Sequence, residues 1–180
     1  MIKKILLILA AAILLLVIVV SLRPSQFTVT RWATIPAAPE VVFAQVNDFH
    51  KWQEWSPWAK MDPACKVAFS GPESGVGAGF SWDGNNDVGA GTMKIIESKP
   101  GELVKMDLDF TKPMEGHNLT VFTFKPNGAS TDVTWTMSGE NGFMGKLFGL
   151  FVDCDKMVGE QFIQGLRNLS GVVTKAPTTN

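Results

Sequence analysis

Apolar and polar positions alternate in several short runs between residues 26 and 140, a pattern typical of half-buried β-strands. The clearest run is LVKMDLDF, residues 103–110, in which Val104, Met106, Leu108 and Phe110 share one side. Further runs begin at or near Gln26, Val67, Gly79, Ala90, His117 and Ser130. Short segments with Gly, Pro or Asn separate most of them, as turns between paired strands do. The sequence therefore predicts an antiparallel meander of six or seven strands.

Helical spacing occurs in two places. After the first strand, Pro39 favours the start of a short helix, and Asp48 favours the cap of a second one that carries Trp52 and Trp55. Pro57 ends this second helix. Beyond residue 140 one apolar stripe at three-or-four spacing predicts a long helix over about 143–169. The stripe consists of Phe143, Leu147, Phe151, Cys154, Val158, Phe162, Leu166 and Leu169.

This order of elements predicts an α+β fold. A curved antiparallel sheet of six or seven strands wraps around the long C-terminal helix, and two short helices follow the first strand. Glycines within the helical stretch, such as Gly145 and Gly149, are costly inside a helix and indicate a bent entry or a close approach to the sheet.

The N-terminal segment is apolar without interruption. Residues 5–22 contain no charged side chain, Lys3 and Lys4 precede them, and Arg23 follows. We interpret residues 1–4 as a cytoplasmic stub, 5–22 as a transmembrane anchor, 23–25 as a linker, 26–170 as the folded domain and 171–180 as a flexible tail. The two lysines place the domain on the non-cytoplasmic side, periplasmic or extracellular. A cleavable secretory signal is the alternative, although residues 19–22 make a poor cleavage site.

Composition limits the classes of function. The chain has 16 basic and 17 acidic residues, and without Lys3 and Lys4 the remainder carries −3, so no basic surface for nucleic acid is expected. Cys65 and Cys154 are far apart and form no CxxC pair. His50 and His117 are isolated as well, so we predict neither a metal site nor a cofactor.

Four motifs resemble a known family. They are TIPAAPEVVFAQVNDFHKWQEWSPW, GVGAGFSWDGNNDVGAGTMKIIES, VTWTMSG and MVGEQFIQGLRNL. Over residues 26–170 they are similar to the polyketide cyclase/dehydrase branch of the START-like helix-grip superfamily, the SRPBCC proteins. The resemblance implies a cavity between sheet and C-terminal helix, in a superfamily whose members bind lipids, hormones and polyketides or catalyse reactions.

We expect the apolar sides of the strands to line such a cavity. The predicted lining is Trp82, Met93, Met106, Leu108, Trp135 and Met137, with Trp52 and Trp55 near the entrance, and Trp58 and Asp83 complete the candidate ligand-binding set. Methionine is flexible and polarisable, so three of them indicate a pocket that tolerates varied shapes. The alternative for Trp52 and Trp55 is that they only pack the short helices onto the sheet.

Three functions remain open. The first is a membrane-anchored domain that binds an apolar or amphipathic small molecule, lipid-like or polyketide-like, without catalysis. The second is a polyketide cyclase/dehydrase-type enzyme that uses a pocket carboxylate, Asp83 or Glu54, although the chain has no Tyr and only Arg31 lies within a strand. The third is a partner-binding domain whose cavity is filled by its own side chains. Catalytic residues and oligomeric state stay unassigned.

Overall fold

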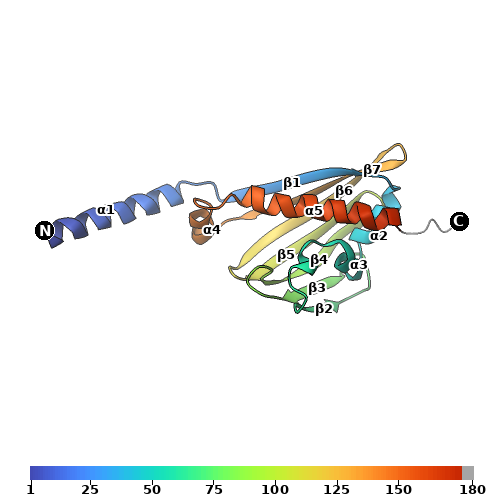
Figure 1. Cartoon of the computed structure of the whole chain (residues 1–180), viewed down its shortest axis with the longest axis horizontal. Helices are drawn as coiled ribbons and strands as arrows, with labels where there is room; N and C mark the ends of the chain where they lie inside the picture. Colours follow the sequence, from blue (N-terminus) through green and yellow to red (C-terminus); the bar gives the residue numbers. More distant parts are fainter. Residues whose placement is uncertain (176–180) are drawn as a thin grey trace.

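The computed structural model of the chain describes residues 1–175. Its centre is one antiparallel sheet of seven strands in the order β1-β7-β6-β5-β4-β3-β2 (Figure 1). The strands are β1 (Gln26–Ile35), β2 (Lys66–Ser70), β3 (Gly79–Asp83), β4 (Ala90–Lys99), β5 (Leu103–Lys112), β6 (Gly116–Asn127) and β7 (Ser130–Glu140). The fold class predicted from the alternating pattern is confirmed. Strands β2 to β7 form a meander in which each strand pairs with the next one in sequence. Within the described residues, the β1–β7 pair is the only one that joins strands distant in sequence.

Two short helices follow β1, also as predicted. Helix α2 (Pro39–Val46) begins at its proline, and α3 (Phe49–Trp55) begins after Asp48, whose carboxylate accepts a hydrogen bond from the backbone N–H of His50 at 2.9 Å. This is the side-chain cap that the sequence indicates. A single 3₁₀ turn, η1 (Trp58–Lys60), follows Pro57. Together these elements close one end of the sheet.

The predicted C-terminal helix is two helices. Helix α4 (Phe143–Phe148) ends at Gly149, and α5 (Cys154–Lys175) begins after a short irregular segment. Phe143 and Phe151, assigned to the buried stripe, are 45 % and 80 % exposed, whereas Phe162, Leu166 and Leu169 are buried. The stripe is therefore correct only for α5. The helix also continues through 171–175, where a flexible tail was expected; the rest of that tail, 176–180, lies outside the described residues.

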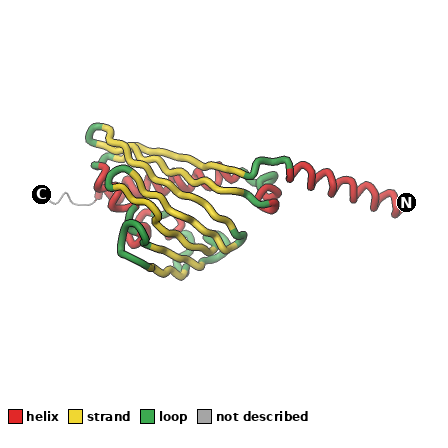
Figure 2. Tube along the Cα trace, turned by 180° about the vertical axis from the view of Figure 1, so that it is seen from behind, coloured by secondary structure: helices red, strands yellow, loops and turns green. Residues whose placement is uncertain are grey.

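The sheet curves around α5, which lies along β1 on the concave side (Figures 1 and 2). Close approach is possible because α5 presents glycines to the sheet. A Cβ on Gly165 would lie 2.8 Å from Cζ3 of Trp135, so a larger residue would push the helix away. The concave face and α5 together form the main hydrophobic core.

Helix α1 (Ile2–Ser21) projects from the domain (Figure 1). Its 20 residues are long and apolar enough to cross a membrane, since about 30 Å of helix spans the hydrocarbon core of a bilayer. Most of its side chains are exposed, but Val20 is fully buried, and α1 contacts α4. We call the end of the domain that carries α4 the anchor end, after the role predicted for α1.

Candidate ligand-binding face

The middle of the concave face is filled by aromatic rings. Trp135 on β7 stacks on Phe162 of α5 with ring centroids 4.0 Å apart and planes 8° apart, and the ring of Phe122 lies 4.6 Å from Trp135. Trp58 meets the same pair edge-on, at 5.9 Å from Trp135 and 6.3 Å from Phe162. Such close stacked and edge-to-face arrangements are the favoured ones for aromatic side chains. This cluster fixes α5 to the sheet.

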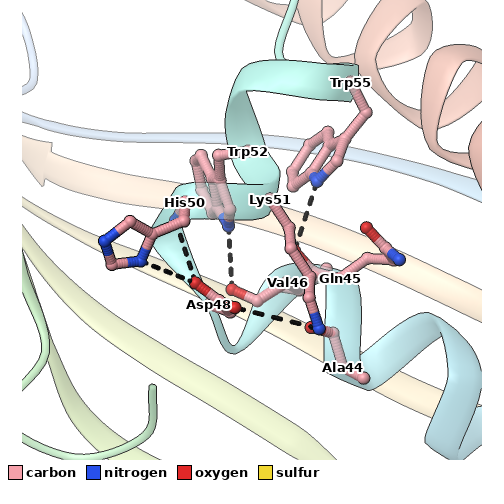
Figure 3. A network of polar contacts seen from close by, with 8 residues as sticks. All are labelled: Ala44, Gln45, Val46, Asp48, His50, Lys51, Trp52 and Trp55. Atoms are coloured by element: carbon pink, nitrogen blue, oxygen red, sulfur yellow. Dashed lines mark hydrogen bonds and ion pairs between the residues drawn. The ribbon is translucent and has the colours of Figure 1, made fainter. Parts of the chain in front are cut away.

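Trp52 and Trp55 belong to the same aromatic cluster. Both indoles of α3 are buried, and both N–H groups donate to backbone oxygens of α2, Trp52 Nε1 to Val46 O at 2.8 Å and Trp55 Nε1 to Gln45 O at 3.2 Å (Figure 3). Their polar atoms are thereby satisfied inside the protein, and their rings face Phe122 and Trp135. We expected these tryptophans near an entrance, but the structure places them in the core, because the turn between α2 and α3 directs them inward.

A less tightly enclosed part of the concave face lies toward the anchor end of the strands. We call it the anchor-end face; it comprises Trp82, Met93, Leu108, Phe110 and Met137. Strand register brings these residues together, since Met93 pairs with Leu108 across β4 and β5, and Gly91 pairs with Phe110. Gly91 is needed here, because a Cβ would lie 2.6 Å from Cη2 of the Trp82 ring that covers it.

Exposure separates this face from the aromatic cluster. Met106 and Trp55 have no exposed area, whereas Met93, Leu108 and Met137 are 8–9 % exposed and Trp82 is half-buried. Nine of the ten predicted site residues thus divide into a packed group and a slightly more exposed group. Trp52, Trp55, Met106 and Trp135 belong to the first, with Trp58 at its margin; Trp82, Met93, Leu108 and Met137 belong to the second.

Asp83 belongs to neither group. It follows Trp82 in β3 and so points to the convex side, where its carboxylate accepts from Lys112 Nζ at 2.9 Å. This hydrogen bond from the ammonium lowers the pKa of Asp83. Asp83, which we predicted to contact the ligand, therefore lies on the side of the sheet opposite the anchor-end face. Glu54, the other carboxylate considered for catalysis, is exposed on α3.

Two polar residues occupy the concave face beside the apolar ones. Asn118 and Thr120 on β6 are buried, and register places them opposite Leu108 and Met106 on β5. The Thr120 hydroxyl has no hydrogen-bond partner within the described chain, and neither has the Trp135 N–H. Buried polar atoms are normally paired, so an unpaired hydroxyl and an unpaired indole N–H are unusual in this core. Neither β6 residue was predicted to line the site, although both lie on the same side of the strand as Phe122 and Phe124.

Among the described residues, Arg31 is the one arginine that lies in a strand. Its side chain is on the concave side of the sheet and already forms an ion pair. Its guanidinium contacts the carboxylate of Asp155 at the start of α5 at 2.8 Å and donates to the Asp155 backbone oxygen at 2.9 Å. The hydrogen bond lowers the pKa of Asp155 and raises that of Arg31. Gly159 leaves the space for the guanidinium, since a Cβ there would lie 2.0 Å from Nη2. This pair positions α5 and offers no free catalytic group.

Two hollows lie at the anchor end. One, of about 630 Å³, lies between the start of β1 and the segment joining α4 to α5, and Arg23, Phe27, Lys146, Phe151 and Cys154 are among its lining residues. The other, of about 490 Å³, lies over the ends of β1, β7 and β6 and includes His117. Phe27 lines both. The larger hollow is the one adjoining the concave side, because α4 and α5 cover that side.

Comparison with known proteins agrees with this geometry. A family model described as "Polyketide cyclase / dehydrase and lipid transport" matches residues 26–174. No curated protein matches the chain. The matched segment includes the whole sheet and nearly all of α5, and it leaves out α1.

Solved structures share the fold at low sequence identity. Mll3558 from Rhizobium loti is 22 % identical with a TM-score of 0.62, and CV1439 from Chromobacterium violaceum is 16 % identical with a TM-score of 0.60; each match covers 81 % of this chain and 96 % of the other. The Aha1 dimer from Colwellia psychrerythraea is 16 % identical with a TM-score of 0.59, covering 84 % and 98 %. At these identities the similarity concerns the fold alone.

Proposed function

The chain belongs to the polyketide cyclase/dehydrase and lipid transport family, and on that premise we propose that it is a membrane-anchored binding protein for an apolar or amphipathic small molecule. The ligand is lipid-like or polyketide-like and lies on the anchor-end face, between the sheet and the start of α5. The name of this family includes lipid transport. Fold alone does not assign a ligand, so the argument rests on the site.

One observation carries this proposal. The anchor-end face is apolar and partly exposed, and beside it lies an unpaired polar group, the Thr120 hydroxyl. A pocket that is mostly apolar with a few polar atoms is typical of small-molecule sites. A molecule with a hydrocarbon body and one oxygen would satisfy both features. The flexible side chains of Met93 and Met137 would adapt to its shape.

Catalysis receives no comparable support. The two candidate carboxylates lie away from this face, and Arg31 is paired with Asp155. A general acid or base must come within hydrogen-bond reach of the reacting group. Binding is therefore the function that we propose for the concave face.

Binding can be tested with the domain freed of α1, because the segment that matches the family, residues 26–174, contains the whole sheet and leaves out α1. We predict that this domain binds a fluorescent fatty acid or sterol and that Leu108→Trp weakens binding at least about tenfold. The larger ring would occupy the space of the ligand. Fluorescence titration measures affinity, and far-UV circular dichroism checks that the variant stays folded.

Asp107→Trp is the matched control, since Asp107 neighbours Leu108 but points to the convex side, and its affinity should equal that of the parent. If the parent binds no apolar probe and Leu108→Trp is instead destabilised by about 1–3 kcal/mol, the face is a filled core. That outcome would falsify the binding proposal and favour a partner-binding domain.

We further propose that α1 anchors the chain with its N-terminus in the cytoplasm and the domain outside it. Lys3 and Lys4 support this orientation, because positively charged flanks remain on the cytoplasmic side. We predict that protease added from the non-cytoplasmic side of intact cells or spheroplasts digests the domain. Digestion only after lysis, or a mature chain that starts after the apolar segment, would show another topology or a cleaved signal.

A further inference from the structure

Exposed apolar side chains gather on α4 and the turn that follows it. Phe143, Met144, Phe148 and Phe151 are between 44 % and 80 % exposed, and we call them the α4 patch. None of these four side chains belongs to the hydrophobic core of the domain. Contiguous exposed apolar surface marks a place where another surface is met.

The position of the patch indicates what that surface is. α4 contacts α1, and Figure 1 shows it at the end of the domain from which α1 departs. Residues 22–25 join α1 to β1, and four residues reach at most about 14 Å when extended. The backbone N–H of Asn141, just before α4, donates to Ser25 O at 2.7 Å and shortens this tether further.

We propose that the α4 patch lies in the lipid interface of the membrane that α1 crosses. This inference rests on the proposed anchoring. Aromatic and methionine side chains partition into the boundary between headgroups and acyl chains, whereas basic residues beside them remain among the headgroups. Lys146 on α4 and Arg23 at the end of α1 are placed for this second role, and Asp153 is the acidic residue in the same hollow.

The position of the α4 patch in the lipid interface also bears on the proposed binding function. The larger hollow includes Phe151 of the patch and Phe27 of the concave side. With the patch in the interface, this hollow opens toward the acyl chains. An apolar ligand that enters the domain from the bilayer would meet this hollow first, at Phe151 and Phe27.

The test uses the full chain reconstituted in phosphatidylcholine vesicles. Cys65 and Cys154 are replaced by serine, and a single environment-sensitive fluorophore is attached at Phe151→Cys. The control carries it at Ala129→Cys, in the exposed β6–β7 turn at the opposite end of the sheet. We expect quenching by lipids spin-labelled within the acyl chain at position 151 and none at position 129.

A second variant distinguishes insertion of the α4 patch into the lipid from simple closeness to the membrane through α1. In a Met144→Asp/Phe148→Asp background the tether is intact, yet the patch is no longer apolar, so quenching at position 151 should fall to the control value. Equal quenching at 151 and 129 overturns the inference, and so does quenching that survives the two aspartates. A blue-shifted but unquenched label also overturns it, because protein and not lipid then covers the patch.

Flotation of the same vesicles distinguishes the two proposals. Chain that floats with the vesicles but shows no quenching leaves the anchor intact and removes only the α4 inference. Chain that does not float removes both. Binding of an apolar probe by the anchor-free domain is measured separately and depends on neither result.

Discussion

Replacing Trp135 with alanine is expected to lower the free energy of unfolding by about 3–5 kcal/mol, the cost typical of removing a large buried aromatic ring. Trp135 is 2 % exposed and stacks on Phe162 of α5 at 4.0 Å. Its N–H has no partner within the described residues, so no hydrogen bond is lost and the cost arises from packing. Urea unfolding of the anchor-free domain, followed by far-UV circular dichroism, measures the change.

Trp32→Ala is the matched control for this prediction. Trp32 lies on the convex side of β1 and is 70 % exposed, so its replacement should change the free energy of unfolding by no more than about 0.5 kcal/mol. A Trp135 variant as stable as the Trp32 variant would mean that α5 is held by other contacts. The central aromatic cluster would then not be the core that the structure shows.

The strands could be predicted because most of them are half-buried, although β2 is exposed along its whole length. In β5 the apolar residues Val104, Met106 and Leu108 are all buried, whereas Lys105 and Asp107 between them face the other way. Local signals also placed α2 and α3, since a proline and a capping aspartate act within one turn of chain. These effects are short in range, and sequence patterns report them directly.

The break between α4 and α5 could not be predicted from periodicity. Phe143 and Phe151 continue the apolar spacing of Phe162 and Leu166, but a pattern does not tell whether the core or a membrane receives an apolar side chain. Glycines near the break indicated only a bend. The helical segment could therefore be predicted from the sequence, but the exposure of its first part, α4, could not.

The candidate site could be predicted only in part for a similar reason. Strand parity assigns Met93, Met106 and Leu108 to one face, but how closely α3 and α5 cover each of them depends on tertiary packing. Trp52 and Trp55 were predicted to lie near the entrance of a cavity, but the turn that precedes α3 directs both side chains into the core. Asn118 and Thr120 could have been found, since β6 alternates from Asn118 to Phe124 on one side.

Thr120→Val is expected to raise the free energy of unfolding of the ligand-free domain by about 1–3 kcal/mol, the cost of burying a hydroxyl without a partner. Valine keeps the shape of threonine and suits a strand. Thr120 is 2 % exposed and its hydroxyl is unpaired within the described chain. Thr131→Val provides the opposite case, because the Thr131 hydroxyl donates to Ala37 O at 2.7 Å and its loss should cost about 1–3 kcal/mol.

The same substitution tests why an unpaired hydroxyl is present at all. If it awaits an oxygen of the ligand, Thr120→Val should bind a sterol about tenfold more weakly than the parent, while binding of the matching oxygen-free hydrocarbon stays unchanged. The domain would then gain stability and lose recognition through one side chain. Destabilisation by Thr120→Val, as by Thr131→Val, would instead show that the hydroxyl is already satisfied, by a buried water for example. In that case the polar atom belongs to the fold and the ligand of this face is recognised by its apolar surface alone.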